Sequence, residues 1–121
     1  MIPLKILIIL AFLLLPFAAS CYRSGPAAYV IAESKDYEAS LYRQHCAVCH
    51  GPEGEGKMLD DGKIVPSLRK GEGEFKFKSE VEIRDHIARG GNGMTPFQNQ
   101  LTDREVRLMA AFVREELRGV K

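Results

Sequence analysis

The chain has 121 residues and nearly balanced charge, with 17 lysine and arginine side chains against 16 aspartate and glutamate side chains and a formal net charge of +1 at pH 7. Proteins that bind nucleic acids need a clear basic excess, so this balance argues against nucleic acid as a partner. The length suits one small domain behind an N-terminal export segment, and no internal repeat is present.

The N-terminal segment has the three parts of a secretory signal peptide. Lys5 precedes an unbroken apolar run at residues 6–15, Pro16 ends the run, and residues 18–20 are small. The run is short for a segment that crosses a bilayer, although an uncleaved anchor of somewhat greater length stays open as an alternative. We therefore predict that residues 1–20 are a signal peptide and that the protein is exported.

Cys21 follows directly and is left over when the other two of the 3 cysteines are assigned to a motif further along the chain. Residues 18–21 are similar to the end of a bacterial lipoprotein signal, although Ala18 stands where leucine is usual. We predict that Cys21 is lipidated, which would anchor the protein on the periplasmic or cell-surface side of a bacterial membrane. Ordinary cleavage that leaves a free thiol is the alternative. Residues 21–33 then read as a tether, and residues 34–121 as the folded domain.

A first helix is predicted over residues 34–44. Tyr37, Leu41 and Tyr42 have helical spacing, and acidic residues stand near the start, where the helix dipole favours them. A segment with two thiols and an imidazole follows at once. The candidate site therefore lies at the end of this helix.

Residues 46–50 read C-A-V-C-H, which is the C-x-x-C-H pattern that attaches a c-type haem. Thiols at this spacing form thioethers to the two vinyl groups of one haem, and the next imidazole reaches the iron from the same side. A thioredoxin-like dithiol would need strand–helix–strand surroundings, a zinc site would need further ligands, and a disulfide is the third alternative. The pattern favours one covalently attached haem c, with Cys46 and Cys49 as the attachment residues and His50 as an iron ligand.

Glycines at positions 51, 54 and 56 predict a tight loop pressed against a planar group. A small hairpin that turns at Asp61-Gly62 is predicted within residues 58–65.

Two capping boxes predict the starts of two more helices, at Ser79 and at Thr102. The first of these helices is expected to stop at Gly90-Gly91. The second has one continuous apolar face, formed by Val106, Met109, Ala110, Val113 and Leu117.

The second axial position of the iron separates electron carriers from gas binders and catalysts. We predict that Met94 fills it, because this residue lies in the glycine-rich loop 90–97, 44 positions beyond His50 (94 − 50), and can arrive from the other side of the ring. A loop methionine that fills a packing gap is the alternative. Other candidates lie too near the attachment site or on packed helix faces: His45, Met58, His86 and Met109.

The motifs stand in the order Tyr42-x-x-x-Cys46-x-x-Cys49-His50-Gly51-x-x-Gly54-x-Gly56, Pro66-x-Leu68 and Gly90-x-x-Gly93-Met94-x-Pro96-Phe97, before a closing amphipathic helix. With them the chain resembles the small monohaem class I cytochromes c of bacteria, from about residue 39 to residue 117. The resemblance implies an all-α fold, with three main helices and loops wrapped around one covalently attached haem. Two features depart from the family pattern: Thr95 separates Met94 from Pro96, and the possible hairpin alters the edge around the haem.

The resemblance also implies roles for particular residues. The first and last helices would cross at Ala39, Tyr42 and Phe112. Tyr42 and Pro66 would belong to the haem pocket, and the Pro66 carbonyl would accept a hydrogen bond from the ring of His50 and fix its orientation.

An iron held by both His50 and Met94 has no vacancy for a substrate, so the expected function is a single-electron carrier and not an enzyme. Its partners would be redox proteins and, through the lipid anchor, a membrane, with no small-molecule substrate. The alternatives are an electron-transfer subunit of a larger oxidoreductase complex and, ranked lower, a haem-based sensor or small-ligand binder.

Overall fold

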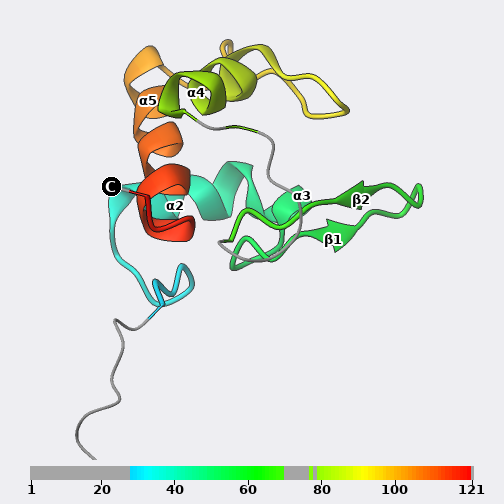
Figure 1. Ribbon diagram of the computed structural model, residues 1–121, viewed down its shortest axis with the longest axis horizontal. Helices are drawn as coiled ribbons and strands as arrows, with labels where there is room; N and C mark the ends of the chain where they lie inside the picture. Colours follow the sequence, from blue (N-terminus) through cyan, green and yellow to red (C-terminus); the bar gives the residue numbers. More distant parts are fainter. Residues whose placement is uncertain (1–27, 70–76, 78, 121) are drawn as a thin grey trace, which may run out of the picture.

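Three main helices and a small hairpin make up the computed structural model, which describes residues 28–69, 77 and 79–120. The helices are α2 (Tyr37–His45), α4 (Glu80–Arg89) and α5 (Asp103–Phe112); a short α3 (Ala47–His50) follows α2, and a π-helical segment η1 (Val113–Leu117) continues α5. This arrangement, seen in Figure 1, confirms the predicted all-α fold. The predicted signal peptide, Cys21 and the first part of the predicted tether lie outside the described residues.

The two predicted capping boxes begin α4 and α5. The Ser79 hydroxyl accepts a hydrogen bond from the Glu82 N–H at 3.2 Å, and the Glu82 carboxylate accepts one from the Ser79 N–H at 3.1 Å. In the second box the Thr102 hydroxyl accepts a hydrogen bond from the Glu105 N–H at 3.3 Å, and the Glu105 carboxylate accepts one from the Thr102 N–H at 2.8 Å. These bonds satisfy N–H groups that have no partner inside a helix, so both helices start where the sequence predicts.

Helix α2 begins at Tyr37, three positions later than predicted (37 − 34). The Ser34 hydroxyl oxygen accepts hydrogen bonds from the Tyr29 hydroxyl at 2.6 Å and from the Asp36 N–H at 3.1 Å. A serine bonded to the backbone two residues on stabilises a turn in competition with a helix. Asp36 is therefore still extended, with ψ at 147°.

Helices α2 and α5 cross where the resemblance implied. Ala39 and Tyr42 are completely buried, Phe112 is almost so, and the Tyr42 and Phe112 rings lie 6.1 Å apart. The Tyr42 hydroxyl donates to the Gly51 carbonyl at 2.9 Å, which satisfies its polar end inside the core. The predicted apolar face of the last helix is buried at every position: Val106, Met109, Ala110, Val113 and Leu117.

The last turn of α5 widens into η1, which the sequence did not indicate. The Arg118 N–H donates to the Val113 carbonyl, five residues back (118 − 113), at 3.1 Å. Single π-helical turns of this kind are rare and are often found near functional sites. Val113 here lines the cavity described below.

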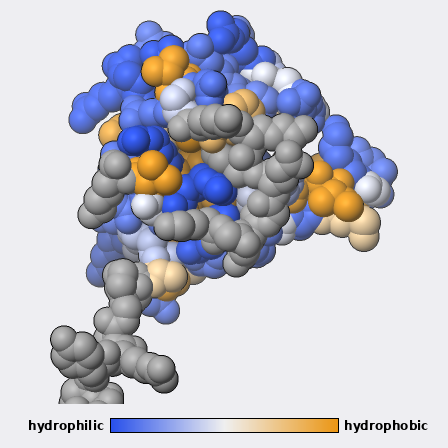
Figure 2. Space-filling model, viewed as in Figure 1, coloured by the Kyte–Doolittle hydropathy of each residue, from blue (hydrophilic) through white to orange (hydrophobic). Residues whose placement is uncertain are grey.

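The predicted hairpin is present. Strands β1 (Lys57–Met58) and β2 (Ile64–Val65) pair antiparallel, and Gly62 has the positive φ of 81° that the turn needs. Met58 and Ile64 face each other across the pair and are 70% and 75% exposed. Figure 2 shows apolar surface on the right, where the hairpin projects from the helices.

Position 56 requires glycine, because the chain after β2 passes close to its backbone. Its φ is +76°, and a Cβ placed on it would lie 2.4 Å from the Val65 carbonyl oxygen and 2.7 Å from the Ser67 nitrogen. The sequence predicted a loop pressed against a planar group, but at this position the close neighbour is the backbone of the same chain.

Residues 29–32 pack on the domain, whereas the sequence suggested a tether as far as residue 33. Ile31 is completely buried. The N–H groups of Ile31 and Ala32 both donate to the Glu53 carboxylate, each at 2.8 Å. These contacts make the segment part of the folded unit.

Arg69 holds Glu53 in place for this contact. Its guanidinium pairs with the Glu53 carboxylate at 2.8 Å and also donates to the backbone carbonyls of Glu53 and Tyr29, at 2.5 and 3.0 Å. The Arg69 side chain is only 17% exposed. One arginine thereby joins the N-terminal segment to the loop that follows the C-x-x-C-H motif.

Arg69→Ala should lower the free energy of unfolding by about 1–3 kcal/mol, because it leaves the Glu53 carboxylate without its cation and removes donors from partly buried carbonyls. Urea unfolding measures the loss. Arg107→Ala, at an exposed position on α5, is the matched control. A loss from Arg69→Ala no larger than that of the control would contradict the assigned role.

Glu105 makes the protein sensitive to acid. It accepts hydrogen bonds from the Tyr37 hydroxyl at 2.5 Å and from the Thr102 N–H, and these lower the pKa of Glu105 from 4.5 to about 2. Because the folded state has the lower pKa, Glu105 contributes stability above pH 4.5 that is lost as the pH falls toward 2. Glu105→Gln should flatten that fall in acid-unfolding curves, and Glu115→Gln, at an exposed position, is the control. Parallel curves for Glu105→Gln and the wild type would refute this prediction.

Candidate haem site

A cavity of about 550 Å³ lies among α3, the hairpin and the loop that follows α4. Cavities that hold small molecules and cofactors have volumes of about 300–1,000 Å³. All six residues that the sequence assigned to the haem line this cavity: Tyr42, Cys46, Cys49, His50, Pro66 and Met94. The structure therefore brings the whole predicted set to one place.

The two thiols lie on a single helical turn. The Cys46 N–H donates to the Tyr42 carbonyl at 2.8 Å and the His50 N–H to the Cys46 carbonyl at 2.9 Å, so α3 follows α2 directly. Cys46 and Cys49 are not joined in a disulfide. Burial raises the pKa of the Cys46 thiol from 9.0 to about 12, and the charge of Cys49 makes a smaller contribution in the same direction. Reactive thiols instead have lowered pKa values, so Cys46 lacks this mark of a redox-active thiol.

His50 has the properties of a metal ligand. Burial and, to a lesser degree, the nearby His86 lower the pKa of His50, which keeps its imidazole neutral and able to donate a lone pair. Its Nδ1 is buried and has no hydrogen-bond partner among the described residues. The hydrogen bond to Pro66 that the resemblance implied is therefore not formed, although Pro66 lines the cavity.

Met94 lies in a tightly folded loop between α4 and α5. Gly91 and Met94 exchange two backbone hydrogen bonds, at 3.1 and 2.9 Å. A Cβ on Gly90 would lie 2.5 Å from the Met94 carbonyl oxygen, so only glycine allows the loop to return this closely. The Phe97 N–H then donates to the Ile87 carbonyl at 3.0 Å, which fastens the loop to α4.

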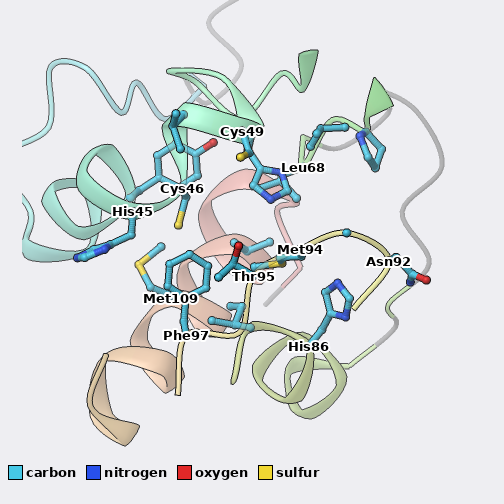
Figure 3. Close-up of a pocket in the computed structure, with 18 of the residues that line it drawn as sticks. His45, Cys46, Cys49, Leu68, His86, Asn92, Met94, Thr95, Phe97 and Met109 are labelled. Atoms are coloured by element: carbon cyan, nitrogen blue, oxygen red, sulfur yellow. The ribbon is translucent and has the colours of Figure 1, made fainter. Parts of the chain in front are cut away.

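Figure 3 shows Cys46 and Cys49 on one side of the cavity and Met94 on the other. The other candidate ligands differ in whether they line the cavity. Met109 is 1% exposed and is both core and cavity wall, while Met58 is 70% exposed and stands outside the lining. His45 also lines the cavity, with its ring edge-on to Phe97 at 6.2 Å.

His86 is partly buried, as its place on a packed helix face predicted. Its side chain lines the cavity from α4, and its ring lies 4.5 Å from the Phe77 ring at an interplanar angle of 36°. The available signal was its place between Ile83 and Ile87, which are both buried. A histidine on the apolar face of an amphipathic helix points toward whatever that face covers.

Comparison with known proteins identifies the family. The family model described as "Cytochrome C oxidase, cbb3-type, subunit III" matches residues 36–113. The chain belongs to this cytochrome c family. Its relative cytochrome c-550 of Bacillus subtilis (strain 168) is 42% identical over 66 residues, which are 52% of this chain and 48% of that protein. The chain thus spans about half the length of that relative.

Among solved structures, the cytochrome is similar to "KustC0563 c-type cytochrome", with 30% sequence identity and a TM-score of 0.41. The match covers 62% of this chain and 90% of the other.

Haem c, covalently attached, is the cofactor of this cytochrome family, and the residues present fit it. The cavity offers two free thiols, a neutral imidazole whose buried Nδ1 lacks a partner, and a thioether on the other side. The rest of the wall is largely apolar, as a porphyrin face requires, and includes Leu59, Leu68, Ile83, Ile87, Phe97 and Val113. Over the described residues, no helix of the cytochrome is long and apolar enough to cross a membrane.

Proposed function

We propose that this cytochrome is a single-electron carrier, with one haem attached through Cys46 and Cys49 and its iron held by His50 and Met94. The observation that carries the proposal is the shared cavity, with the cysteines of α2–α3 on one side and Met94 on the other. When bound, haem c supplies an iron centre that gains or loses one electron.

The protein's own residues would hold this centre rigidly. The Met94 loop is fastened by its hydrogen bonds to Gly91 and by the bond from Phe97 to α4. The attachment segment is fastened by the bonds of Cys46 and His50 to the preceding turn. Two rigid ligand segments would keep the coordination the same in both oxidation states, which favours rapid electron transfer.

The composition of the cavity would set a high reduction potential. A thioether ligand favours ferrous iron more than a second imidazole does, and apolar walls that exclude water act in the same direction. Ile83, Ile87 and Met109 are buried residues of the cavity wall. Val48, in the attachment segment, is exposed and lines the cavity, and a partner would exchange electrons at the haem edge beside it.

The proposal includes export and a membrane tether. Residues 1–20 would direct the chain out of the cytoplasm, and a lipidated Cys21 would hold it on the periplasmic or cell-surface side. The folded unit would then meet redox proteins through small, transient interfaces.

A second candidate is an electron-transfer subunit of a larger oxidoreductase. It is favoured by the family description, which names a subunit of a cbb3-type oxidase. Extraction with mild detergent separates the two candidates: a stable association with a larger catalytic protein favours the subunit, and a monodisperse small cytochrome favours the free carrier.

The visible spectrum of the oxidised full-length protein tests the iron ligands. It should show the methionine–iron charge-transfer band, and Met94→Ala should abolish that band. Met58→Ala is the matched control, because Met58 is exposed on β1 and stands outside the cavity lining. A spectrum without the band, or a band that survives Met94→Ala, would contradict the assignment.

A further inference from the structure

The Met94 side of the cavity holds a second potential iron ligand. His86 lines the same cavity as His50 and Met94, and Figure 3 shows its ring on the Met94 side, across from the two cysteines. An imidazole in this position is chemically able to bind haem iron.

The fold keeps His86 and Met94 close together. His86 lies in the last turn of α4, and its carbonyl accepts the Gly90 N–H at 2.8 Å where the Met94 loop begins. The loop then folds back, since Gly91 bonds to Met94 in both directions. A Cβ on Gly91 would lie 3.6 Å from Cε1 of His86, so the ring stands against the base of this loop.

Within the part of the chain that the structure describes, no hydrogen bond or ion pair engages the nitrogens of His86, and its ring packs on Phe77. The His86 ring lines the same cavity as the His50 ring.

We propose that His86 is a reserve axial ligand, which binds the haem iron when Met94 is not bound to it. The exchange breaks one iron–sulfur bond and forms one iron–nitrogen bond, and the oxidation state of the iron does not change. Because a second imidazole lowers the reduction potential relative to a thioether, the exchange would convert a high-potential carrier into a low-potential one. This proposal rests on the proposed function, in which Met94 is the resting ligand.

Oxidation of Met94 would hold the protein in the exchanged state. Met94 is half-buried, and its neighbours Asn92, Gly93 and Thr95 are exposed, so a peroxide can reach the sulfur in molecules where it has left the iron. Conversion of the thioether to a sulfoxide makes the side chain polar, and the change is enzymatically reversible. With the peroxide as oxidant, the sulfur gains one oxygen atom and the peroxide is reduced to water or an alcohol.

The experiment uses the full-length holoprotein and begins with the methionine–iron band. That band should be present in the wild type and in His86→Ala, and lost in Met94→Ala; a wild type without it refutes the proposed function, independently of His86. In Met94→Ala the iron should stay six-coordinate and low-spin, with the electron paramagnetic resonance signature of two imidazoles. The further change His86→Ala should then make the iron high-spin.

Carbon monoxide binding to the reduced protein gives the second readout. The affinity for carbon monoxide should be at least about tenfold lower in Met94→Ala than in Met94→Ala/His86→Ala. This is expected if His86 leaves the vacated iron position free in about a tenth of the molecules or fewer. Met94→Leu, which keeps the side-chain bulk, repeats the series if the alanine variant folds poorly.

Two other cavity residues serve as controls. His45 lines the cavity from α2, on the cysteine side, and Lys63 reaches the Met94 loop, where a Cβ on Gly93 would collide with its Nζ. Adding His45→Ala or Lys63→Ala to Met94→Ala should leave the low-spin state unchanged. A five-coordinate Met94→Ala protein, or a low-spin state that persists without His86, would overturn the proposal.

Discussion

Protein made with Cys46→Ser and Cys49→Ser together should carry no covalently bound haem and should lose its cooperative unfolding transition. Without the porphyrin, apolar residues from α2, α4 and α5 would line a cavity of about 550 Å³ in a domain of fewer than 100 residues. A domain of this size has a free energy of unfolding of only about 5–15 kcal/mol. The stabilisation lost with its central apolar group is comparable with that entire free energy.

Extraction of haem into acidified organic solvent, followed by urea unfolding, measures both effects. Val48→Ser is the matched control, because Val48 lies between the two cysteines and is 70% exposed. It should retain the haem and unfold within about 0.5 kcal/mol of the wild type. Haem that resists extraction from the double serine variant would show that these thiols are not the attachment points.

Phe112→Ala should destabilise the holoprotein by about 3–5 kcal/mol, the range for truncating a well-packed aromatic residue. Phe112 is 4% exposed at the crossing of α5 with α2, where its ring meets Tyr42 and also lies 5.3 Å from Tyr29, edge-on. The change would therefore loosen α2, α5 and the N-terminal segment together.

Urea unfolding of the oxidised holoprotein gives this value. Val81→Ala, at an exposed apolar position on α4, is the control and should cost less than about 0.5 kcal/mol. A loss for Phe112→Ala that is no greater than for Val81→Ala would mean that the helix crossing does not stabilise the fold.

Local signals in the sequence predicted most of the helical fold. The capping boxes at Ser79 and Thr102 satisfy N–H groups within three residues, so their effect does not depend on the rest of the chain. The apolar face of α5 follows from helical spacing, and the hairpin follows from the Asp61-Gly62 turn.

Features that depend on distant contacts were missed. Ile31 is buried because Glu53 and Arg69 hold its segment, and these partners stand 22 (53 − 31) and 38 (69 − 31) positions away. The later start of α2 is a local effect that was also missed: the Ser34 hydroxyl accepts the Asp36 N–H and the Tyr29 hydroxyl, inside a segment that has no periodic pattern. Sequence periodicity carries no information about such pairings.

In the candidate site, too, residues in local motifs were predicted and an approach that depends on the folded chain was not. Cys46, Cys49 and His50 form one local motif, and the Met94 loop is marked by its glycines, so all four were identifiable. His86 was among the candidate ligands, but its approach to Met94 was not predictable, because it depends on how the loop folds back over the end of α4.

The most direct test is the intact mass of mature protein, produced where the haem-attachment machinery is present. We expect a single species heavier than the polypeptide by one haem, with the added mass on the peptide that contains residues 46–49. A mature chain with the mass of the unmodified polypeptide, or with the haem on a peptide elsewhere, would contradict it.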